Sequence, residues 1–588
     1  MARLSYQAPG VYVEEVPSAQ QPIAGVGTNT VGFIGVVPDE IQYPEANPDY
    51  DPVSAQLALE VARIIDAGGS LPKKKKAELE QQIKELDKQI EPLKKNVSTR
   101  RKELNEKSQK LPQIEIEEQE ALASFEENLP PELSASDRKK QITKKKEEID
   151  ANVRAKNKEV KDLSESIEND EKAIQQLEDE KGILQTQLEG KAVSPQTKVG
   201  TRLCPYKLET FTVNVQPGQT KLCTNFSEYK DHFGPFSADK PDQLEKPHLP
   251  IFPGHRWLTH AVNGFFNNGG TRCFVARVNP TSQGGANMGE IKRALVAFES
   301  IDAVAIVAAP GIADPAVWQE IVAHCETCED RFAIFDCPEV VGTEEELDIK
   351  QLSYDSPDNV LPQRSKNAAF YFPYIEVVDP AKQMQDEDPG RGVSLKYAGR
   401  IFVPPSGHIA GIYARSDEKR GVHKAPANEA VRGALNVKYY IGKPKQEMLN
   451  PQGVNVIRNI NGNITVWGAR TIGGDRNGEW KYVNVRRFFL FLAESIDEGT
   501  QWVVFEPNDR ALWGKIKRNV GAFLTNIWRS GALFGATPEE AFYVKCDDET
   551  NPPEVRDLGQ VVTEIGVAIV RPAEFVIFRI TQSTGPRT

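Results

Sequence analysis

The clearest pattern of apolar positions in the chain is a heptad repeat between residues 79 and 188. In its first half, steps of three, four or seven residues join Leu79, Ile83, Leu86, Ile90, Leu93, Val97, Leu104 and Leu111. In its second half, the same steps join Ile142, Ile149, Val153, Val160, Leu163, Ile167, Ile174, Leu177, Leu184 and Leu188. This spacing gives a helix one apolar stripe and is typical of helices that pack along a shared seam. The pattern therefore predicts two long helices.

The residues between the two stripes predict a turn. Pro112, an acidic run through Glu120 and the segment Leu129-Pro130-Pro131 separate the stripes, and proline is disfavoured inside a helix. An antiparallel hairpin with its tip near Pro130 is the simplest closure. Residues 79–111 would give an arm of roughly 50 Å at 1.5 Å per residue, and Pro92 is expected to kink it.

Charge marks this hairpin as a separate module. Residues 73–190 carry 25 basic and 28 acidic side chains, about 45% of the segment, against about 22% in the rest of the chain. We interpret the hairpin as an insertion into a globular α/β body that resumes near Val199-Gly200. Two interpretations of it stay open, a solvated intramolecular spacer and a surface arm that docks another molecule.

Outside the insertion, short apolar runs alternate with helical patterns. Strands are predicted at 273–278, 304–308 and 332–336, and helices at 291–299 and 315–325. This alternation is typical of a largely parallel sheet covered by helices. The 588 residues suffice for about three or four domains, and we expect one of them between about 200 and 475.

Two amphipathic helices are predicted after this domain, at 485–496 and 509–528. The second has apolar residues at helical spacing, from Leu512 and Trp513 to Ile527. Its opposite face carries Lys515, Arg518, Thr525 and Arg529. This face is therefore basic although the chain as a whole is acidic.

Both ends of the chain have the composition of strands. Residues 6–16 are β-prone; Pro9-Gly10 bounds their apolar part at the start, and Pro17 bounds it at the end. Residues 573–581 include Phe575-Val576-Ile577-Phe578-Arg579-Ile580. A strand that is apolar on both faces belongs inside a sheet. Each terminal strand could pair within its own domain or complete the sheet of a neighbouring subunit, and exchange of the second kind propagates as a helical or ring-stacked lattice.

The overall composition excludes several classes of protein. A net charge of −12 gives no reason to expect nucleic-acid binding. The longest apolar run, 303–309, is far shorter than the roughly 18 residues of a membrane span. Seven scattered cysteines argue for reduced thiols, and residues 1–10 contain no apolar leader segment. We expect a soluble protein that is synthesised in the cytoplasm.

Candidate catalytic and metal sites are weak. His324, Cys325, Cys328 and Cys337 invite a zinc or redox interpretation, but Cys325 continues a helical apolar stripe and is better interpreted as a buried thiol. Glycines 25, 27, 32 and 35 do not have the spacing of a phosphate loop. No nucleophile or metalloprotease motif accompanies the seven histidines. We therefore expect no catalytic residue, no metal and no cofactor.

Several motifs together carry a family resemblance. The opening Ala8-Pro-Gly-Val-Tyr-Val-Glu-Glu-Val16 resembles the start of tail sheath proteins from contractile phage tails and related contractile injection systems. Val403-Pro-Pro-Ser-Gly-His-Ile-Ala-Gly-Ile-Tyr-Ala-Arg415, followed by Gly421-Val-His-Lys-Ala-Pro-Ala-Asn428, is a highly specific pair of this family. The remaining matches, in the family's order, are 262–275, 331–338, 455–458, 466–471, 484–487, 504–508 and 541–546.

The resemblance implies an α/β (α+β) multidomain sheath fold, with a C-terminal core domain, an α/β middle domain and the inserted antiparallel coiled-coil hairpin. We expect a linker strand and the start of the core at 1–45, and a connecting or outer region at 46–71 and 191–260. The hairpin would occupy 72–190, the middle domain 261–475 and the C-terminal domain 476–588.

The resemblance also implies a function. Sheath subunits form stacked hexameric rings, a helical assembly around an inner tube, and their contraction drives the tube through a target envelope without consuming nucleotide. Baseplate and terminal cap proteins would be further partners in the phage tail or phage-tail-like injection particle, a virion-type structural role assembled in the cytoplasm. No nucleic-acid partner and no membrane insertion are expected, and the partner of the hairpin is unknown.

The family exchanges its terminal strands between neighbouring subunits. Here that implicates Val11, Tyr12, Val13 and Val16 at one end and Phe575, Val576, Ile577, Phe578 and Ile580 at the other. Because the C-terminal domain faces the tube in this family, Lys515, Arg518 and Arg529 could contact an acidic tube surface.

Other functions stay open from the sequence. One is an α/β enzyme whose coiled-coil arm recruits substrate, and another is a static shell or adhesin. An enzyme would remain a small defined oligomer, whereas a sheath would polymerise into large tubes. The type VI sheath is less favoured, since it is split over two chains and this chain carries both the N- and C-terminal motifs.

Overall fold

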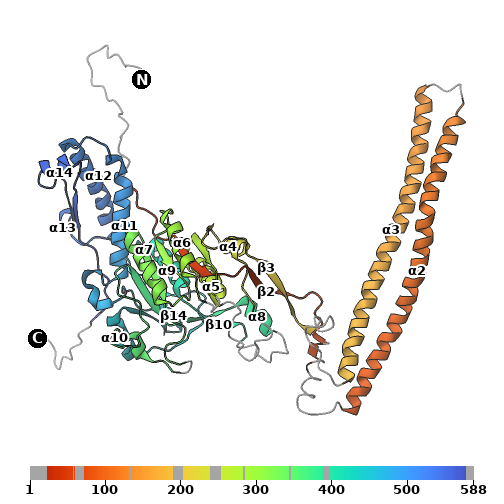
Figure 1. Cartoon of the computed structure of the whole chain (residues 1–588), viewed down its shortest axis with the longest axis horizontal. Coiled ribbons are helices and arrows are strands. Elements are labelled where there is room, and N and C mark those ends of the chain that lie inside the picture. Colours follow the sequence, from red (N-terminus) through yellow and green to blue (C-terminus); the bar gives the residue numbers. More distant parts are fainter. Residues whose placement is uncertain are drawn as a thin grey trace, which may run out of the picture. The chain divides into compact units, whose positions relative to one another are not determined.

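The computed structural model describes residues 23–53, 55–56, 59, 72–130, 135–189, 203–238, 253–281, 285–343, 346–387 and 398–577. These residues belong to two compact units (Figure 1). The first, here called the body, comprises described residues of Met1–Pro44, Leu208–Gln383 and Gly399–Thr588. The second, here called the insertion unit, comprises those of Glu45–Lys207 and Met384–Ala398.

A nine-stranded sheet, with the order β11-β14-β13-β8-β7-β6-β1-β5-β4, forms the centre of the body. Its strands are β1 (Val31–Val36), β4 (Thr220–Cys223), β5 (Cys273–Val278), β6 (Ile306–Ala308), β7 (Phe332–Asp336), β8 (Ala368–Phe372), β11 (Glu429–Ala430), β13 (Val454–Ile460) and β14 (Asn463–Val466). The six strands from β5 to β13 are parallel, and the outer strands pair antiparallel. The prediction of a largely parallel sheet is confirmed, although β6 begins two residues later than expected.

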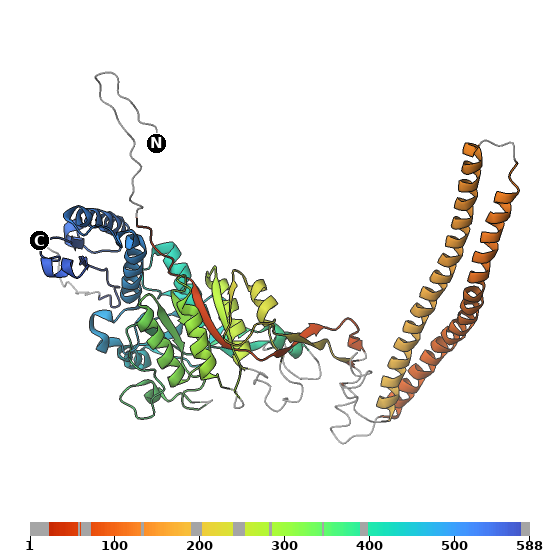
Figure 2. The same cartoon turned by 45° about the horizontal axis from the view of Figure 1, so that its top comes forward.

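Both faces of this sheet are buried. In β1, drawn red in Figure 2 between strands of the yellow and green segments, Val31 and Phe33 join one apolar cluster and Ile34 joins another. Helices α5 (Pro253–Asn268) and α9 (Ser406–Arg420) contribute to the first cluster. Helices α6 (Met288–Glu299) and α7 (Pro315–Cys328) contribute to the second. Parallel strands need this cover because neither of their faces is polar.

Helices α5 and α9 approach each other through glycines. A Cβ atom on Gly407 would lie 2.2 Å from the carbonyl oxygen of Ala261, and one on Gly411 would lie 2.4 Å from that of Phe265. Both glycines belong to the 403–415 motif. The motif therefore sets how closely these two helices pack.

The chain also contains smaller elements. The other strands are β2 (Glu40–Ala46) with β3 (Tyr206–Thr212), β10 (Arg400–Val403), β9 (Ile375–Val378) and β12 (Asn436–Val437) in a three-stranded sheet, and β15 (Phe542–Lys545) with β16 (Glu564–Val567). The short helices are α4 (Phe226–Phe233), α8 (Pro380–Asp386), α10 (Lys443–Leu449), α13 (Pro538–Ala541) and α14 (Pro553–Asp557), with 3-10 turns η3 (Ile349–Leu352), η5 (Asn450–Gln452), η6 (Gly474–Trp480) and η7 (Gln501–Val503).

The C-terminal part of the body is built on α11 (Val483–Thr500) and α12 (Arg510–Arg529). Asp509 caps α12 by accepting a hydrogen bond from the Leu512 amide at 2.8 Å. The predicted apolar stripe of α12 is buried together with α11 residues and strands β15 and β16 in a third cluster. Both predicted amphipathic helices are therefore confirmed, with boundaries shifted by a few residues.

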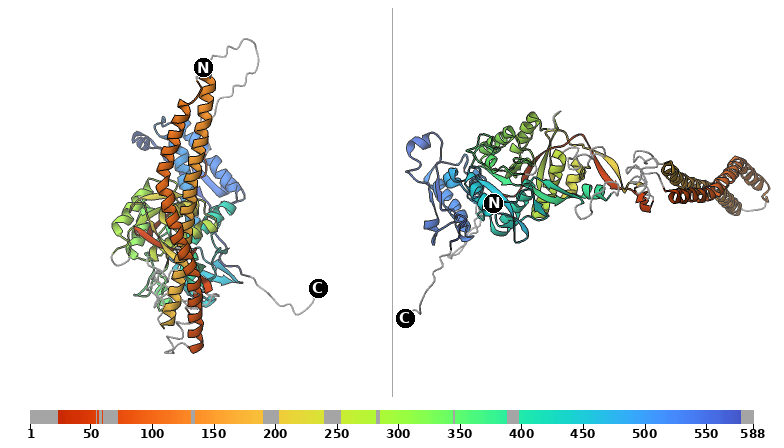
Figure 3. Two further views of the ribbon diagram at one scale, coloured as in Figure 1. Left: turned by 90° about the vertical axis from the view of Figure 1, so that its right-hand side faces the viewer. Right: turned by 90° about the horizontal axis from the view of Figure 1, so that it is seen from below.

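The insertion unit contains α2 (Lys73–Glu127) and α3 (Ala135–Leu188), which lie side by side (Figures 1 and 3). Residues of both predicted stripes, from Leu79 and Leu86 to Ile174 and Leu184, form one apolar cluster. Ion pairs Asp87–Lys181, Lys94–Glu178 and Lys107–Glu159 join the helices in opposite order, so the two helices run antiparallel.

The expected interruption at Pro112 is wrong, because α2 continues through Pro92 and Pro112 to Glu127. The apolar stripe explains this, since Leu111 just before the proline and Ile114, Leu122 and Phe125 beyond it are all half-buried. A proline removes a single helical hydrogen bond, and in α2 this loss is outweighed by packing on both sides. The 55 residues of α2 span about 80 Å rather than 50 Å.

Candidate assembly site

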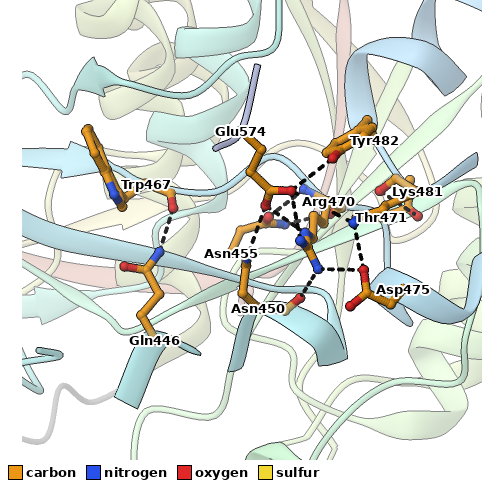
Figure 4. A network of polar contacts seen from close by, with 10 residues as sticks. All are labelled: Gln446, Asn450, Asn455, Trp467, Arg470, Thr471, Asp475, Lys481, Tyr482 and Glu574. Carbon is orange, nitrogen blue, oxygen red and sulfur yellow. Dashed lines mark hydrogen bonds and ion pairs between the residues drawn. The ribbon is translucent and has the colours of Figure 1, made fainter. Parts of the chain in front are cut away.

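Glu574, near the start of the predicted C-terminal strand 573–581, lies in a carboxylate socket on the body (Figure 4). Arg470 donates from Nε and Nη2 to the two oxygens of Glu574, both at 2.8 Å. Asn450 donates from Nδ2 to Oε1 at 2.8 Å, and the Tyr482 hydroxyl donates to Oε2 at 2.9 Å. We call Arg470, Asn450 and Tyr482 the Glu574 socket.

The socket is assembled from separate elements. Asn450 begins η5, Arg470 follows β14, and Tyr482 is the N-cap residue of α11. Buried Asn455 on β13 fixes the backbone of Arg470, because its amide donates to the Arg470 carbonyl at 2.8 Å and accepts from the Arg470 N–H at 2.7 Å. The 455–458 and 466–471 motifs therefore meet here.

Arg470 pairs with two carboxylates, so its buried charge is neutralised. The Arg470 side chain is 3% exposed, and it also donates to Asp475 at 3.0 Å and to the Asn450 carbonyl at 2.9 Å. Partial burial acts to raise the pKa of Glu574, but hydrogen bonds from Arg470 and Asn450 outweigh it and hold that pKa below its ordinary value. Glu574 is therefore bound as a carboxylate at neutral pH.

Beyond the socket, the chain exposes apolar side chains. Phe575, Val576 and Ile577 are 70%, 68% and 81% exposed, and residues 573–577 form no strand. The expected strand is thus absent from this part of the single chain, because within it no second strand pairs with these residues. Phe578 and Ile580 lie outside the described residues.

The N-terminal segment is anchored to α11 and α9. Arg487 donates to both carboxylate oxygens of Asp417, at 3.0 and 2.6 Å, and to the carbonyl of Thr28 at 2.9 Å. The Thr28 hydroxyl donates to Asp417 at 2.8 Å, and Ile23 is buried in the α11–α12 cluster. Val11, Tyr12, Val13 and Val16 lie outside the described residues.

The β15–β16 sheet has unpaired edges. Phe542 to Lys545 pair antiparallel with Val567 to Glu564, and the sheet contains no third strand among the described residues. One face packs on α12, whereas Tyr543 is 53% exposed. A two-stranded sheet is only marginally stable alone, and unpaired edges accept further strands.

The basic face of α12 is also accessible. Arg518 and Arg529 are exposed and Lys515 is half-buried. Within the described residues none of the three forms an ion pair with an acidic side chain, unlike Arg510, which pairs with Asp548 at 3.1 Å. These charges are therefore available to an acidic partner.

The cysteine and histidine cluster has the structure of a protein core. Cys325 is buried on α7, and burial raises the pKa of its thiol above the ordinary value. His324 contacts Arg331 at 3.1 Å, which occupies one ring nitrogen. Across the described ranges, no group of three or more His, Cys, Asp or Glu side chains could hold a metal ion, and no helix there is long and apolar enough to cross a membrane.

The sequence interpretation missed the residues that anchor both terminal segments. Arg470, Asn455 and Arg487 lie within quoted motifs, but their roles require partners up to several hundred residues away. Glu574 offered one local signal, a lone acidic residue at the start of an apolar run.

The body thus has exposed apolar residues directly after Glu574 and a two-stranded sheet with no third strand among the described residues. Two family models match this chain, the phage tail sheath protein central domain over residues 284–472 and the phage tail sheath C-terminal domain over residues 475–583. Together the matches span just over half of the chain. The chain belongs to the phage tail sheath family, as its motifs indicated.

Individual relatives agree with this assignment. The tail sheath protein of Vibrio phage KVP40 is 27% identical over 181 residues, which are 30% of this chain and 26% of the relative. That of Salmonella phage ViI is 24% identical over 254 residues, which are 42% of this chain and 38% of the relative. The chain thus spans about a quarter to two-fifths of the length of these curated relatives.

A solved structure is similar over nearly two thirds of the chain. The PVC sheath complex of an extracellular contractile injection system, in its contracted state, has a TM-score of 0.50 and 27% identity, covering 63% of this chain and 88% of that chain. The family and its structural neighbours are structural sheath proteins, which favours the sheath interpretation over the α/β enzyme.

Proposed function

We propose that this protein is the subunit of a contractile tail sheath, which polymerises as stacked hexameric rings around an inner tube and contracts to drive the tube through a target envelope. The observation that carries the proposal is the apolar segment Phe575-Val576-Ile577. It directly follows the anchored residue Glu574, and its side chains are exposed in the single chain. Exposed apolar side chains of this kind need a partner to cover them.

Strand exchange would provide that cover. In the proposed lattice, Val11, Tyr12, Val13 and Val16 from one neighbour and Phe575, Val576, Ile577, Phe578 and Ile580 from another pair with the C-terminal domain. The β15–β16 sheet is the proposed acceptor, since its edges are unpaired in the described chain. Main-chain hydrogen bonds would then hold neighbours together while rigid domains change their packing.

The stroke needs no cofactor in this proposal. Free energy stored at assembly, behind a kinetic barrier, is released when the subunits pack again in the contracted lattice. The inner tube protein, a baseplate and a terminal cap are the proposed partners besides the subunit itself. Assembly would take place in the cytoplasm.

The basic face of α12, with Lys515, Arg518 and Arg529, is the proposed tube contact. Exposed ion pairs contribute only about 0–1 kcal/mol each and are screened by salt. Weak contacts suit a sheath that must release the tube during contraction.

For the insertion unit we propose an antiparallel coiled-coil hairpin. Its apolar seam and interhelical ion pairs support this assignment. The hairpin acts either as a spacer or as a docking arm. Replacing residues 73–189 with a short Gly-Ser linker distinguishes the two. If the hairpin is a spacer, any further component still attaches to the tubes; if it is a docking arm, that attachment is lost.

Electron microscopy of the full chain, expressed alone and with its tube protein, tests the proposed function. We expect short wide tubes from the chain alone and longer, narrower tubes around the inner tube. Discrete small particles under both conditions would favour the enzyme with a substrate-recruiting arm instead, and tubes of a single length a static shell.

A chain lacking residues 1–17 tests strand exchange at the N-terminus. We expect it to fold as a monomer and to form no tubes, because the body is anchored from Ile23 onward. Circular dichroism checks the fold, and normal-length sheaths from this truncated chain would contradict the proposal.

A further inference from the structure

The Glu574 socket holds one point of the C-terminal segment unusually firmly. Each carboxylate oxygen of Glu574 accepts two hydrogen bonds, one of them from Arg470 in a paired, two-point contact (Figure 4). Paired arginine–carboxylate contacts are among the stronger polar interactions and fix orientation as well as position. In contrast, the next three side chains along the chain are largely exposed.

The chain before Glu574 is attached only as far as Val570. The Ala568 amide donates to the Ala541 carbonyl at 2.9 Å, Ile569 bridges to Leu533, and the Val570 amide donates to the Ala532 carbonyl at 3.3 Å. Residues 571–573 form no backbone hydrogen bond to any described residue. Glu574 is therefore a second attachment point, separated from Val570 by three residues that form no backbone hydrogen bond to a described residue.

From this arrangement we infer that the Glu574 socket sets the length of the free C-terminal tether between neighbouring subunits. With Glu574 bound, the exchanged strand leaves the body directly at Phe575; without it, residues 571–574 would join the free tether between the body and that strand. Releasing residues 571–574 would lengthen the tether by up to about 14 Å at 3.3–3.6 Å per residue. Glu574 and Arg470 are positioning residues, and the inference rests on the proposed strand exchange.

Tether length controls assembly through effective concentration. The local concentration of a tethered strand falls roughly as the −3/2 power of tether length once the tether can span its sites, so doubling the length lowers it about threefold. A longer tether also permits more than one spacing between neighbours. Loss of the socket should therefore weaken assembly and broaden the distribution of tube geometries.

Glu574→Ala is the first variant to test. Arg470 keeps its partner Asp475 at 3.0 Å, so the socket is not left with an unpaired buried charge. We expect the subunit concentration at which half of the protein sediments as tubes to rise by about threefold or more, with little change in monomer unfolding temperature. Glu554→Ala, an exposed glutamate on α14 without an ion pair to a described residue, is the matched control.

A compensating deletion separates tether length from mere stability. Removing residues 571–573 in the Glu574→Ala chain takes away three of the four released residues, and we expect it to restore tube formation toward the normal concentration. If Glu574 only stabilised the subunit, this deletion would give no rescue, and the inference would be wrong. Wild-type assembly by Glu574→Ala would overturn it as well.

Two further chains keep the outcomes distinct. If Glu574→Ala lowers the monomer unfolding temperature, Glu574→Gln is tested as well, because glutamine keeps the side-chain length and one acceptor oxygen. Its assembly concentration should lie between those of the wild-type and Glu574→Ala chains. An assembly concentration equal to that of the wild-type chain would contradict the inference. A chain ending at Glu574 removes the exchanged strand itself. If it forms normal tubes, C-terminal strand exchange is wrong; if it fails while Glu574→Ala assembles normally, only the socket inference is wrong.

Discussion

At the scale of single residues, Asp336 joins two family motifs in the core. It ends β7 and accepts hydrogen bonds from the Ser406 amide at 2.7 Å, the Ser406 hydroxyl at 2.6 Å and the Gly311 amide at 3.2 Å. Ser406 begins α9, so the carboxylate also lies at the positive end of a helix dipole. This one side chain therefore attaches α9 to the sheet.

Asp336→Ala should destabilise the subunit. The change leaves two buried N–H groups and a hydroxyl without an acceptor, which we expect to lower the free energy of unfolding by roughly 2–5 kcal/mol. Urea unfolding of unassembled subunits measures it, with exposed Asp358→Ala as control. Equal midpoints for the two variants would show that Asp336 does not hold α9.

The buried histidines predict a loss of stability at acidic pH. Burial lowers the pKa of His255 to about 4 and that of His408 to about 3, whereas in the unfolded chain both stay near 6.5. Between these values the unfolded state binds protons and the folded state does not, so stability falls as pH drops from about 6.5 toward 4, by about 3 kcal/mol for His255.

His255→Gln should reduce this pH dependence. The difference in unfolding free energy between the variant and the wild-type chain is compared at pH 7.5 and pH 5, because the difference cancels other titrating groups. Among these is Asp336, whose pKa burial raises to about 7 and whose protonation acts in the opposite direction. A difference that does not change with pH would contradict the assignment.

At the scale of elements, the contact between α5 and α9 depends on Gly411. Because a Cβ atom there would meet the Phe265 carbonyl, Gly411→Ala should lower the free energy of unfolding by about 1–3 kcal/mol. Gly521→Ala on α12 is the matched control, since nothing lies within 4 Å of its added Cβ and helix propensity favours alanine by up to about 1 kcal/mol. Thermal unfolding of both variants should therefore shift in opposite directions.

The elements themselves were largely predictable from local patterns. A helical period located α6, α7, α11 and α12, and short apolar runs located the parallel strands β5, β6 and β7, because each of these elements buries a continuous face or run. Pro112 misled the prediction, since a proline signal was weighed without the packing of α2 on α3. The strand predicted at 573–581 stays a prediction, because residues 573–577 have no partner strand among the described residues and the proposed partner belongs to a neighbouring subunit.

At the scale of the whole molecule, the basic face of α12 makes the proposed tube contact testable. Lys515→Glu with Arg518→Glu reverses two charges of this face and should impair co-assembly with an acidic tube protein, most strongly at low salt. The matched control is Lys443→Glu with Lys445→Glu, which makes the same change of charge at exposed positions of α10. Co-sedimentation across a salt series compares the two, and unchanged co-assembly of the α12 variant at low salt would discard the contact.

Local sequence patterns were enough to predict the two insertion helices, three of the parallel strands, helices α6, α7, α11 and α12, the burial of Cys325 and the family of the protein. Each of these depends on residues close together in the chain, where spacing records burial directly. Only the tertiary structure decided that Glu574, Arg470, Asn450 and Tyr482 form one socket, and that Thr28, Asp417 and Arg487 form another anchor. Such sites bring together residues separated by up to hundreds of positions, and no local periodicity encodes which of them meet.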